Sequence, residues 1–185
     1  MTPRSTWRRA GVAYAATLVA FLLLDAVWLT TMAERLYRPA IGHLMQPGFA
    51  WEPALLFYAL YILGLVVFGV SAGLERGSSS VAAARCALFG LIAYATYDLT
   101  NQATLQGWPW IVTLADLAWG TVASGVAGGV ACRATLASES RRASARSIDQ
   151  MPTSEPIARA IALSNTRRPC TEARQMHSPP SSSTG

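Results

Sequence analysis

The chain has 185 residues, of which 52% are hydrophobic and only 14% are charged, with a formal net charge of +5. Soluble domains carry about 25% charged residues, so this composition indicates a membrane protein. Every basic residue is an arginine, and the arginines flank apolar segments instead of gathering on one face, which argues against nucleic-acid binding. Three cysteines without CxxC spacing and two histidines, His43 and His177, leave almost no ligands for a zinc or haem site.

Four apolar segments follow along the chain, at about residues 12–32, 54–72, 81–105 and 110–132. Each has about the 20 residues that cross ~30 Å of hydrocarbon as a helix. Helix is the expected state because backbone groups in lipid must be satisfied within the segment. The sequence therefore predicts an all-α membrane protein, a bundle of four transmembrane helices within residues 1–135.

The first segment also resembles a signal peptide, because arginines precede it and a short apolar run follows them. Its apolar run continues past Asp25 to Met32, however, which is long for such a peptide. We therefore expect a retained helix.

Arginine placement predicts the orientation of the helices. Arginines lie before the first segment, between the second and third, and after the fourth, at positions 4, 8, 9, 76, 85, 133, 141, 142 and 146. The connection at residues 106–109 has no charge, whereas Arg35 and Arg38 form a discordant group that Glu34 and Glu52 offset. We expect a bacterial inner-membrane protein with both termini in the cytoplasm, and no disulfides, because all three cysteines then lie near the reducing side.

Two further features lie at the ends of the segments. Trp108 and Trp110 are expected to form an aromatic belt at the outer boundary. From about residue 136 serine, arginine, proline and threonine dominate, and no aromatic residue follows Trp119. Such a composition buries too little apolar surface to fold, so residues 136–185 are predicted to be a disordered cytoplasmic tail.

Three aspartates, Asp25, Asp98 and Asp116, lie inside the apolar segments. Each would cost roughly 2.5–3.5 kcal/mol at the centre of a bilayer helix, so a function for them is the first hypothesis. With the orientation above, all three are expected at one depth, about 10 Å from the outer surface. Ionised together they would repel one another, so at least one is expected to be protonated or bound to a cation.

Neighbouring polar and aromatic residues share helix faces with these aspartates, since residues three or four apart are adjacent on a helix. The pattern Asp-x-x-Trp occurs twice, in segments that run in opposite directions, which is compatible with an inverted repeat. The predicted ligand-binding residues are Asp25, Trp28, Tyr58, Tyr61, Tyr94, Asp98, Asn101, Asp116 and Trp119. The alternative is that these groups bond one another and hold the bundle together.

Small residues mark one face of the fourth segment. Gly120, Ser124 and Gly128 follow at four-residue spacing, and Gly125 and Gly129 form a GxxxG pattern. Small residues let membrane helices approach closely. The first three continue the face of Asp116, so we expect them to pack inside the bundle and not against a second protomer.

The stretches around Asp25–Trp28, Tyr97–Asn101 and Asp116–Gly120, with residues 37–43 and Phe57–Tyr58, resemble a known family. The chain is similar over about residues 10–134 to the bacterial predicted membrane proteins grouped as domain of unknown function 2177. That resemblance implies four membrane helices and no particular activity. The tail lies outside it.

Three classes of function stay open. The leading hypothesis is binding or transport of a small molecule or cation through the Asp/Trp/Tyr pocket, with Trp28 and Trp119 offering cation–π contacts. Four helices are few for a complete path, so transport would require a homodimer. The alternatives are a membrane-embedded enzyme that acts on a lipid or isoprenoid, with an aspartate as general acid, and an accessory membrane subunit. No cofactor, metal or catalytic set is indicated.

Overall fold

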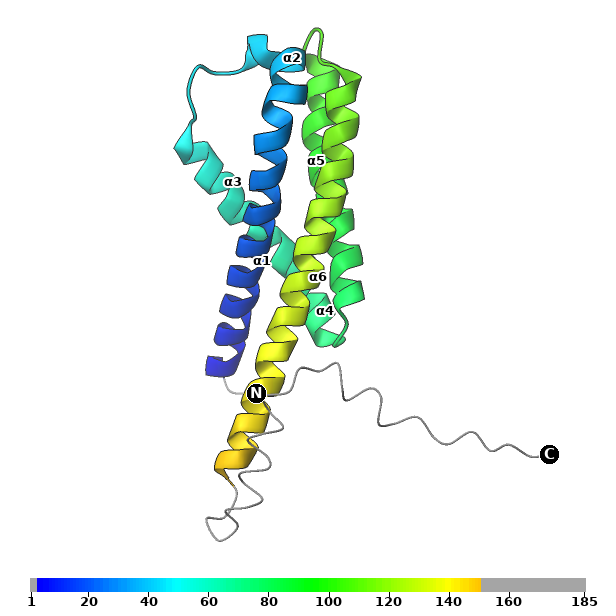
Figure 1. Cartoon of the computed structure of the whole chain (residues 1–185). Helices are drawn as coiled ribbons and strands as arrows, with labels where there is room; N and C mark the ends of the chain where they lie inside the picture. The colour runs from blue at the N-terminus through cyan, green and yellow to red at the C-terminus, as the bar shows by residue number, and fades with distance from the viewer. Residues whose placement is uncertain (1–2, 151–185) are drawn as a thin grey trace, which may run out of the picture. The chain divides into compact units, whose positions relative to one another are not determined.

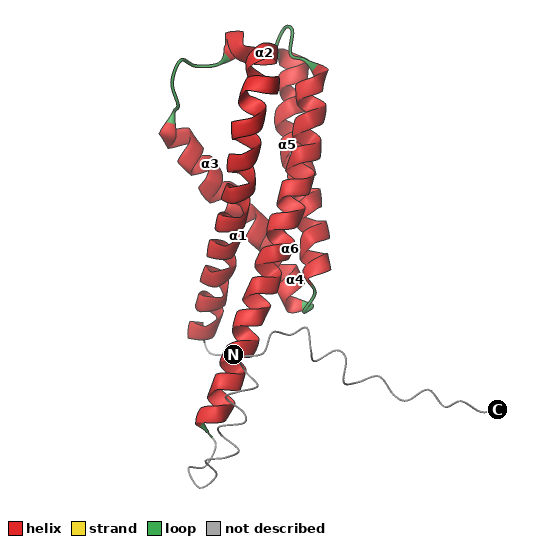
Figure 2. Cartoon of the chain, viewed as in Figure 1, coloured by secondary structure: helices red, strands yellow, loops and turns green. Residues whose placement is uncertain are grey.

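The computed structural model describes residues 3–150 of the chain, and these residues are mostly helical, with no strand among them (Figure 2). Four of its helical segments are long and apolar enough to cross a membrane: Thr6–Leu44, Trp51–Glu75, Ser79–Thr104 and Trp110–Asp149. The prediction of an all-α protein with four membrane helices is confirmed.

Two of the four spans are interrupted by π-helical turns. The first consists of α1 (Pro3–Met32), the π-helical turn η1 (Ala33–Tyr37), α2 (Arg38–Ile41) and the 3₁₀ turn η2 (Gly42–Leu44). The second consists of α3 (Trp51–Gly64), the π-helical turn η3 (Leu65–Val70) and α4 (Ser71–Glu75). The remaining spans are single helices, α5 (Ser79–Thr104) and α6 (Trp110–Asp149). Turns of π-helix inside α-helices often occur at functional sites.

Helices α1 and α5 run in one direction and α6 runs in the other (Figure 1). The first residues of α3 lie away from α1, and the two helices approach each other toward the C-terminal end of α3 (Figure 1). Large apolar side chains on the outside recur at helical spacing, including Val19, Leu23 and Val27 on α1. Such stripes are exposed in the isolated chain and contact the lipid bilayer in a membrane protein.

Tight turns join the helices at both ends of α5. Gly77 has a φ of 62°, and the Ser78 N–H donates to the Gly73 carbonyl at 2.9 Å, which closes the end of α4. The Ser78 hydroxyl then accepts from the Val81 N–H at 3.4 Å and caps the start of α5. At the other end Gly107, with a φ of 76°, makes the turn into α6.

Close contact between α5 and α6 depends on small residues. A Cβ on Gly90 would overlap the Gly120 carbonyl oxygen, and one on Gly128 would overlap the Cys86 sulfur. The GxxxG residues also face α5, because Gly125 and Gly129 lie against Ala87 and Ala83. The small-residue face of α6 therefore packs inside the chain and is not free to hold a second protomer.

Helix α6 is longer than the sequence predicted. It continues to Asp149, so residues 136–149 are helical and not part of a disordered tail. Alanine and arginine are frequent there and no proline occurs before Pro152, so extending an existing helix is favourable. The remainder of the predicted tail, residues 151–185, lies outside the described residues. The bundle itself belongs to a unit that ends at Ala137.

Candidate functional site

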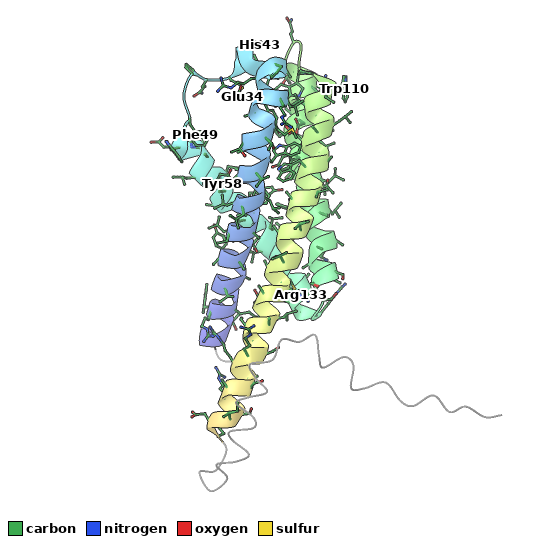
Figure 3. All side chains as sticks on the ribbon, viewed as in Figure 1. Glu34, His43, Phe49, Tyr58, Trp110 and Arg133 are labelled. Atoms are coloured by element: carbon green, nitrogen blue, oxygen red, sulfur yellow. The ribbon has the colours of Figure 1, made fainter. Side chains whose placement is uncertain are left out.

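Asp25 lies on α1 and is bonded by two aromatic side chains from other helices. The Tyr58 hydroxyl, on α3, donates to one carboxylate oxygen at 2.5 Å, and the Trp119 indole N–H, on α6, donates to the other at 3.4 Å. Tyr58 lies where α3 passes α1 (Figure 3). Both oxygens of this buried carboxylate therefore have donors, as a buried charge requires.

Asp116, on α6, is bonded in a similar way by a residue that the sequence did not suggest. Its acceptor oxygen receives a hydrogen bond from the Tyr37 hydroxyl, at the end of the π-helical turn η1. The same hydroxyl oxygen accepts the Trp28 indole N–H at 2.8 Å. Trp28 and Asp25 share a face of α1, yet Trp28 bonds the partner of Asp116 and not Asp25.

The two tryptophans stack on each other between these aspartates. The ring centroids of Trp28 and Trp119 are 4.5 Å apart and the rings are 7° from parallel. No cation fits between the two facing rings, so the cation–π contact expected of this pair is not available on those faces. Each aspartate precedes its tryptophan by three residues, and the helices are antiparallel, so Asp25 and Asp116 lie on opposite sides of the stack.

The hydrogen bonds therefore divide the polar residues into two clusters, and the prediction that the three aspartates lie at one depth stays a prediction. We call the first the Asp25 cluster: Asp25, Tyr58, Tyr61, Tyr94 and Ser124. Its Tyr61 and Ser124 hydroxyls are 2.7 Å apart and hydrogen-bonded, and the Tyr61 and Tyr94 rings meet edge to face at 6.1 Å. Gly120 allows this packing, because a Cβ there would overlap the Tyr94 ring.

The second group, which we call the Asp98 cluster, consists of Tyr37, Asp98, Asn101 and Asp116. Asp98 is 0% exposed, and neither of its carboxylate oxygens has a hydrogen-bond partner in the part of the chain that the structure describes. The side-chain nitrogen of Asn101, one turn further along α5, is likewise buried without a partner. Asp98 also lies near Tyr37, and it is close enough to Asp116 for the two carboxylates to repel each other when both are ionised.

The end of the bundle beyond the Asp98 cluster is closed by a small network. The Trp108 indole N–H donates to the Thr113 hydroxyl at 3.1 Å, and that hydroxyl donates to the Gln102 side-chain oxygen at 3.3 Å. Gln102 in turn donates to the Trp108 carbonyl at 3.1 Å. Trp108 is thus a buried part of the turn and not a belt residue, whereas Trp110 is exposed as expected.

All nine predicted ligand-binding residues thus lie in these two clusters or in the tryptophan stack between them. Tyr37, Ser124 and Gln102 also contribute and were not predicted as site residues. Tyr37 belongs to one of the stretches that resemble the known family, which was the only signal for it. Among the described residues no group of three or more His, Cys, Asp or Glu side chains could hold a metal ion.

Comparison with known proteins supports the membrane assignment. No curated protein and no solved structure is significantly similar to the chain. The family described as "Predicted membrane protein (DUF2177)" matches residues 10–133, a range that holds both clusters and all four spans' apolar parts. The chain therefore belongs to this family of predicted membrane proteins.

Proposed function

We propose that this integral membrane protein binds a small monovalent cation, in the first place a proton, at Asp98. The observation that supports this is the contrast among three buried aspartates. Asp25 and Asp116 accept hydrogen bonds from tyrosines, whereas both oxygens of the fully buried Asp98 have no partner. An ionised carboxylate in that position costs several kcal/mol, so a positive charge or a proton has to accompany it.

The complete burial of Asp98 and the small number of charged ligands around it favour the proton over larger occupants. Asp98 is completely enclosed, and a proton converts it into a neutral acid without needing further room. A divalent metal ion takes six or more oxygen ligands, or several nitrogen and sulfur ligands, and the described residues offer no such group. A singly charged species that needs one carboxylate fits the Asp98 cluster better.

The wider proposal is that this site serves binding or transport of a small molecule through Asp25, Trp28, Tyr58, Tyr61, Tyr94, Asp98, Asn101, Asp116 and Trp119. We place the protein in the bacterial inner membrane with both termini in the cytoplasm. Transport would need a homodimer, and its interface would have to avoid the small-residue face of α6, which α5 already covers.

Thermal melting in detergent at several pH values tests the proposal with three proteins: the wild type, Asp98→Asn and Glu52→Gln. Glu52 is an exposed carboxylate and serves as the matched control. If Asp98 is protonated in the folded protein, the folded state binds one proton more than the unfolded state. Stability then falls as pH rises, by about 1.4 kcal/mol per pH unit while that difference persists.

The wild type and Glu52→Gln are expected to melt at lower temperatures in alkaline buffer than in acidic buffer. Asp98→Asn is expected to lose most of this dependence of the melting temperature on pH. Addition of Na⁺, K⁺ or Li⁺ in alkaline buffer then distinguishes the occupants. Restored stability in the wild type alone identifies a metal cation, and no response identifies the proton. An Asp98→Asn variant with the wild-type pH and salt profile would show that Asp98 binds neither.

A further inference from the structure

The Tyr37 hydroxyl lies between an indole donor and a carboxylate, so its hydrogen can be donated only to the carboxylate. The Trp28 indole is a donor without an acceptor, so its N–H uses a lone pair of the Tyr37 oxygen. The phenolic hydrogen is therefore left for Asp116, which receives it. Asp116 must act as an acceptor in this chain of bonds, and a hydrogen bond to a carboxylate favours its charged form.

The neighbouring carboxyl group has the opposite surroundings. Asp98 has no exposed surface, and among residues 3–150 no group donates to either of its oxygens, so its charge lacks the stabilisation that Asp116 has. The two carboxyl groups are close enough to repel each other when both are ionised. The surroundings of Asp116 therefore favour its charged form, whereas those of Asp98 favour uptake of a proton or a cation.

We propose that Tyr37 is a positioning residue that holds Asp116 as a carboxylate, so that the Asp98–Asp116 pair takes up one positive charge and takes it at Asp98. This inference rests on the proposed binding function and deepens it, because it limits the ligand to species with a single charge. Without the Tyr37 hydroxyl, Asp116 would lose a hydrogen bond that favours its charged form, and it would take up a proton of its own.

The titratable groups that act on Asp116 come from three elements. They are Tyr37 from η1, Asp25 from α1, and Asp98 and Tyr94 from α5. Asp25 keeps its own donors, Tyr58 and Trp119, on the far side of the tryptophan stack. Tyr58 therefore offers a matched control for Tyr37, since each tyrosine donates to one buried aspartate.

Infrared spectroscopy in mildly acidic buffer free of Na⁺, K⁺ and Li⁺ provides the test, because a protonated carboxyl group has its own C=O stretching band. The wild type is expected to show one such band that disappears in Asp98→Asn. Tyr37→Phe is expected to add a second band, which disappears again in Tyr37→Phe/Asp116→Asn. Tyr58→Phe is expected to add none, because Asp25 keeps the Trp119 donor.

Two results would overturn the inference. One is a Tyr37→Phe spectrum without a second band, or with a band that persists when Asp116 is also replaced. The other is a band that is lost in Asp116→Asn but kept in Asp98→Asn, which would mean that the protonated group is Asp116 although Tyr37 is present. These two single variants need no change at Tyr37, so they test the inference even if Tyr37→Phe fails to fold. A wild type without an Asp98 band would instead contradict the proposed binding function.

Discussion

Gly90 is the residue where α5 and α6 approach most tightly, and its substitution should weaken the bundle that holds both clusters. A Cβ at this position would overlap the Gly120 backbone carbonyl and the Ser124 side chain. Backbone cannot move aside cheaply, so Gly90→Ala should cost about 1–3 kcal/mol of stability, as other overpacking substitutions do.

Gly11→Ala is the matched control for Gly90→Ala, because Gly11 is also helical but has no atom within 4 Å of the added methyl group. Alanine is the better helix former, so this control should be neutral or slightly stabilising. Thermal melting in detergent compares the two. Equal melting temperatures would mean that the α5–α6 contact is looser than described.

For the three aspartates, the sequence indicates their place inside apolar segments but not their hydrogen-bond partners. Their burial was expected from their place in apolar segments, and all three are buried. Their different surroundings could not be predicted, because the donors come from distant parts of the chain. Tyr37 and Asp116 are 79 positions apart, and the bond between them depends on how η1 turns at the end of α1.

At the scale of single elements, hydropathy located the four spans but not the ends of the helices. Hydropathy measures where lipid contact is favourable, whereas a helix ends where its hydrogen bonds or its residues no longer allow it to continue. Helix α6 therefore passes its apolar part and reaches Asp149. The π-helical turns η1 and η3 have no sequence signature of this kind, because their extra residue depends on packing against the rest of the bundle.

The end of α6 gives a prediction about which residues the bundle requires. Cys132 belongs to the buried core and its thiol contacts the Ser78 carbonyl, while Leu136 packs against that core. A chain that ends at Ala137 should therefore insert and melt like the full chain. A chain that ends at Ala131 should lose stability, by about 1–3 kcal/mol for the buried side chains removed.

Detergent-solubilised yield and thermal melting of these two truncated chains make the comparison. Because they differ only in residues 132–137, both lack the whole of the segment beyond. Equal losses in both would show that the bundle depends on residues after Ala137. Equal stability of all three chains would show that Cys132 and Leu136 contribute nothing.

At the scale of the whole molecule, antiparallel packing of α1 and α6 brings the repeated Asp-x-x-Trp patterns together. The Trp119 indole donates to Asp25, the aspartate of the other pattern. The Trp28 indole donates to Tyr37, which in turn donates to Asp116. The sequence showed that the pattern is repeated. It could not show that each tryptophan serves the aspartate of the other pattern, because this depends on how the helices pack. The direction of the bundle in the membrane also matters, because the Asp98 and Asp25 clusters lie on opposite sides of the tryptophan stack.

The placement of the arginines predicts that direction. Arginines gather at the ends of helices where the α4–α5 turn lies, whereas the α5–α6 turn at residues 105–109 has none. In the one discordant region Arg38 pairs with Glu34 at 2.8 Å. Because arginine-rich connections stay in the cytoplasm, the α5–α6 turn should face the periplasm and the α4–α5 turn the cytoplasm.

Two cysteine variants test this topology on opposite ends of one helix. Gln106→Cys and Ser80→Cys each place a thiol at an exposed position, just beyond the C-terminal end of α5 and in its first turn, in a chain whose Cys170 is replaced by serine. The two remaining native thiols, Cys86 and Cys132, are buried. A maleimide that cannot cross membranes should label Gln106→Cys in intact spheroplasts and Ser80→Cys only after the membrane is opened. The reverse labelling pattern would mean that the bundle has the opposite orientation. The Asp98 cluster would then lie nearer the cytoplasm, and the proton proposed to bind there would come from the cytoplasmic side.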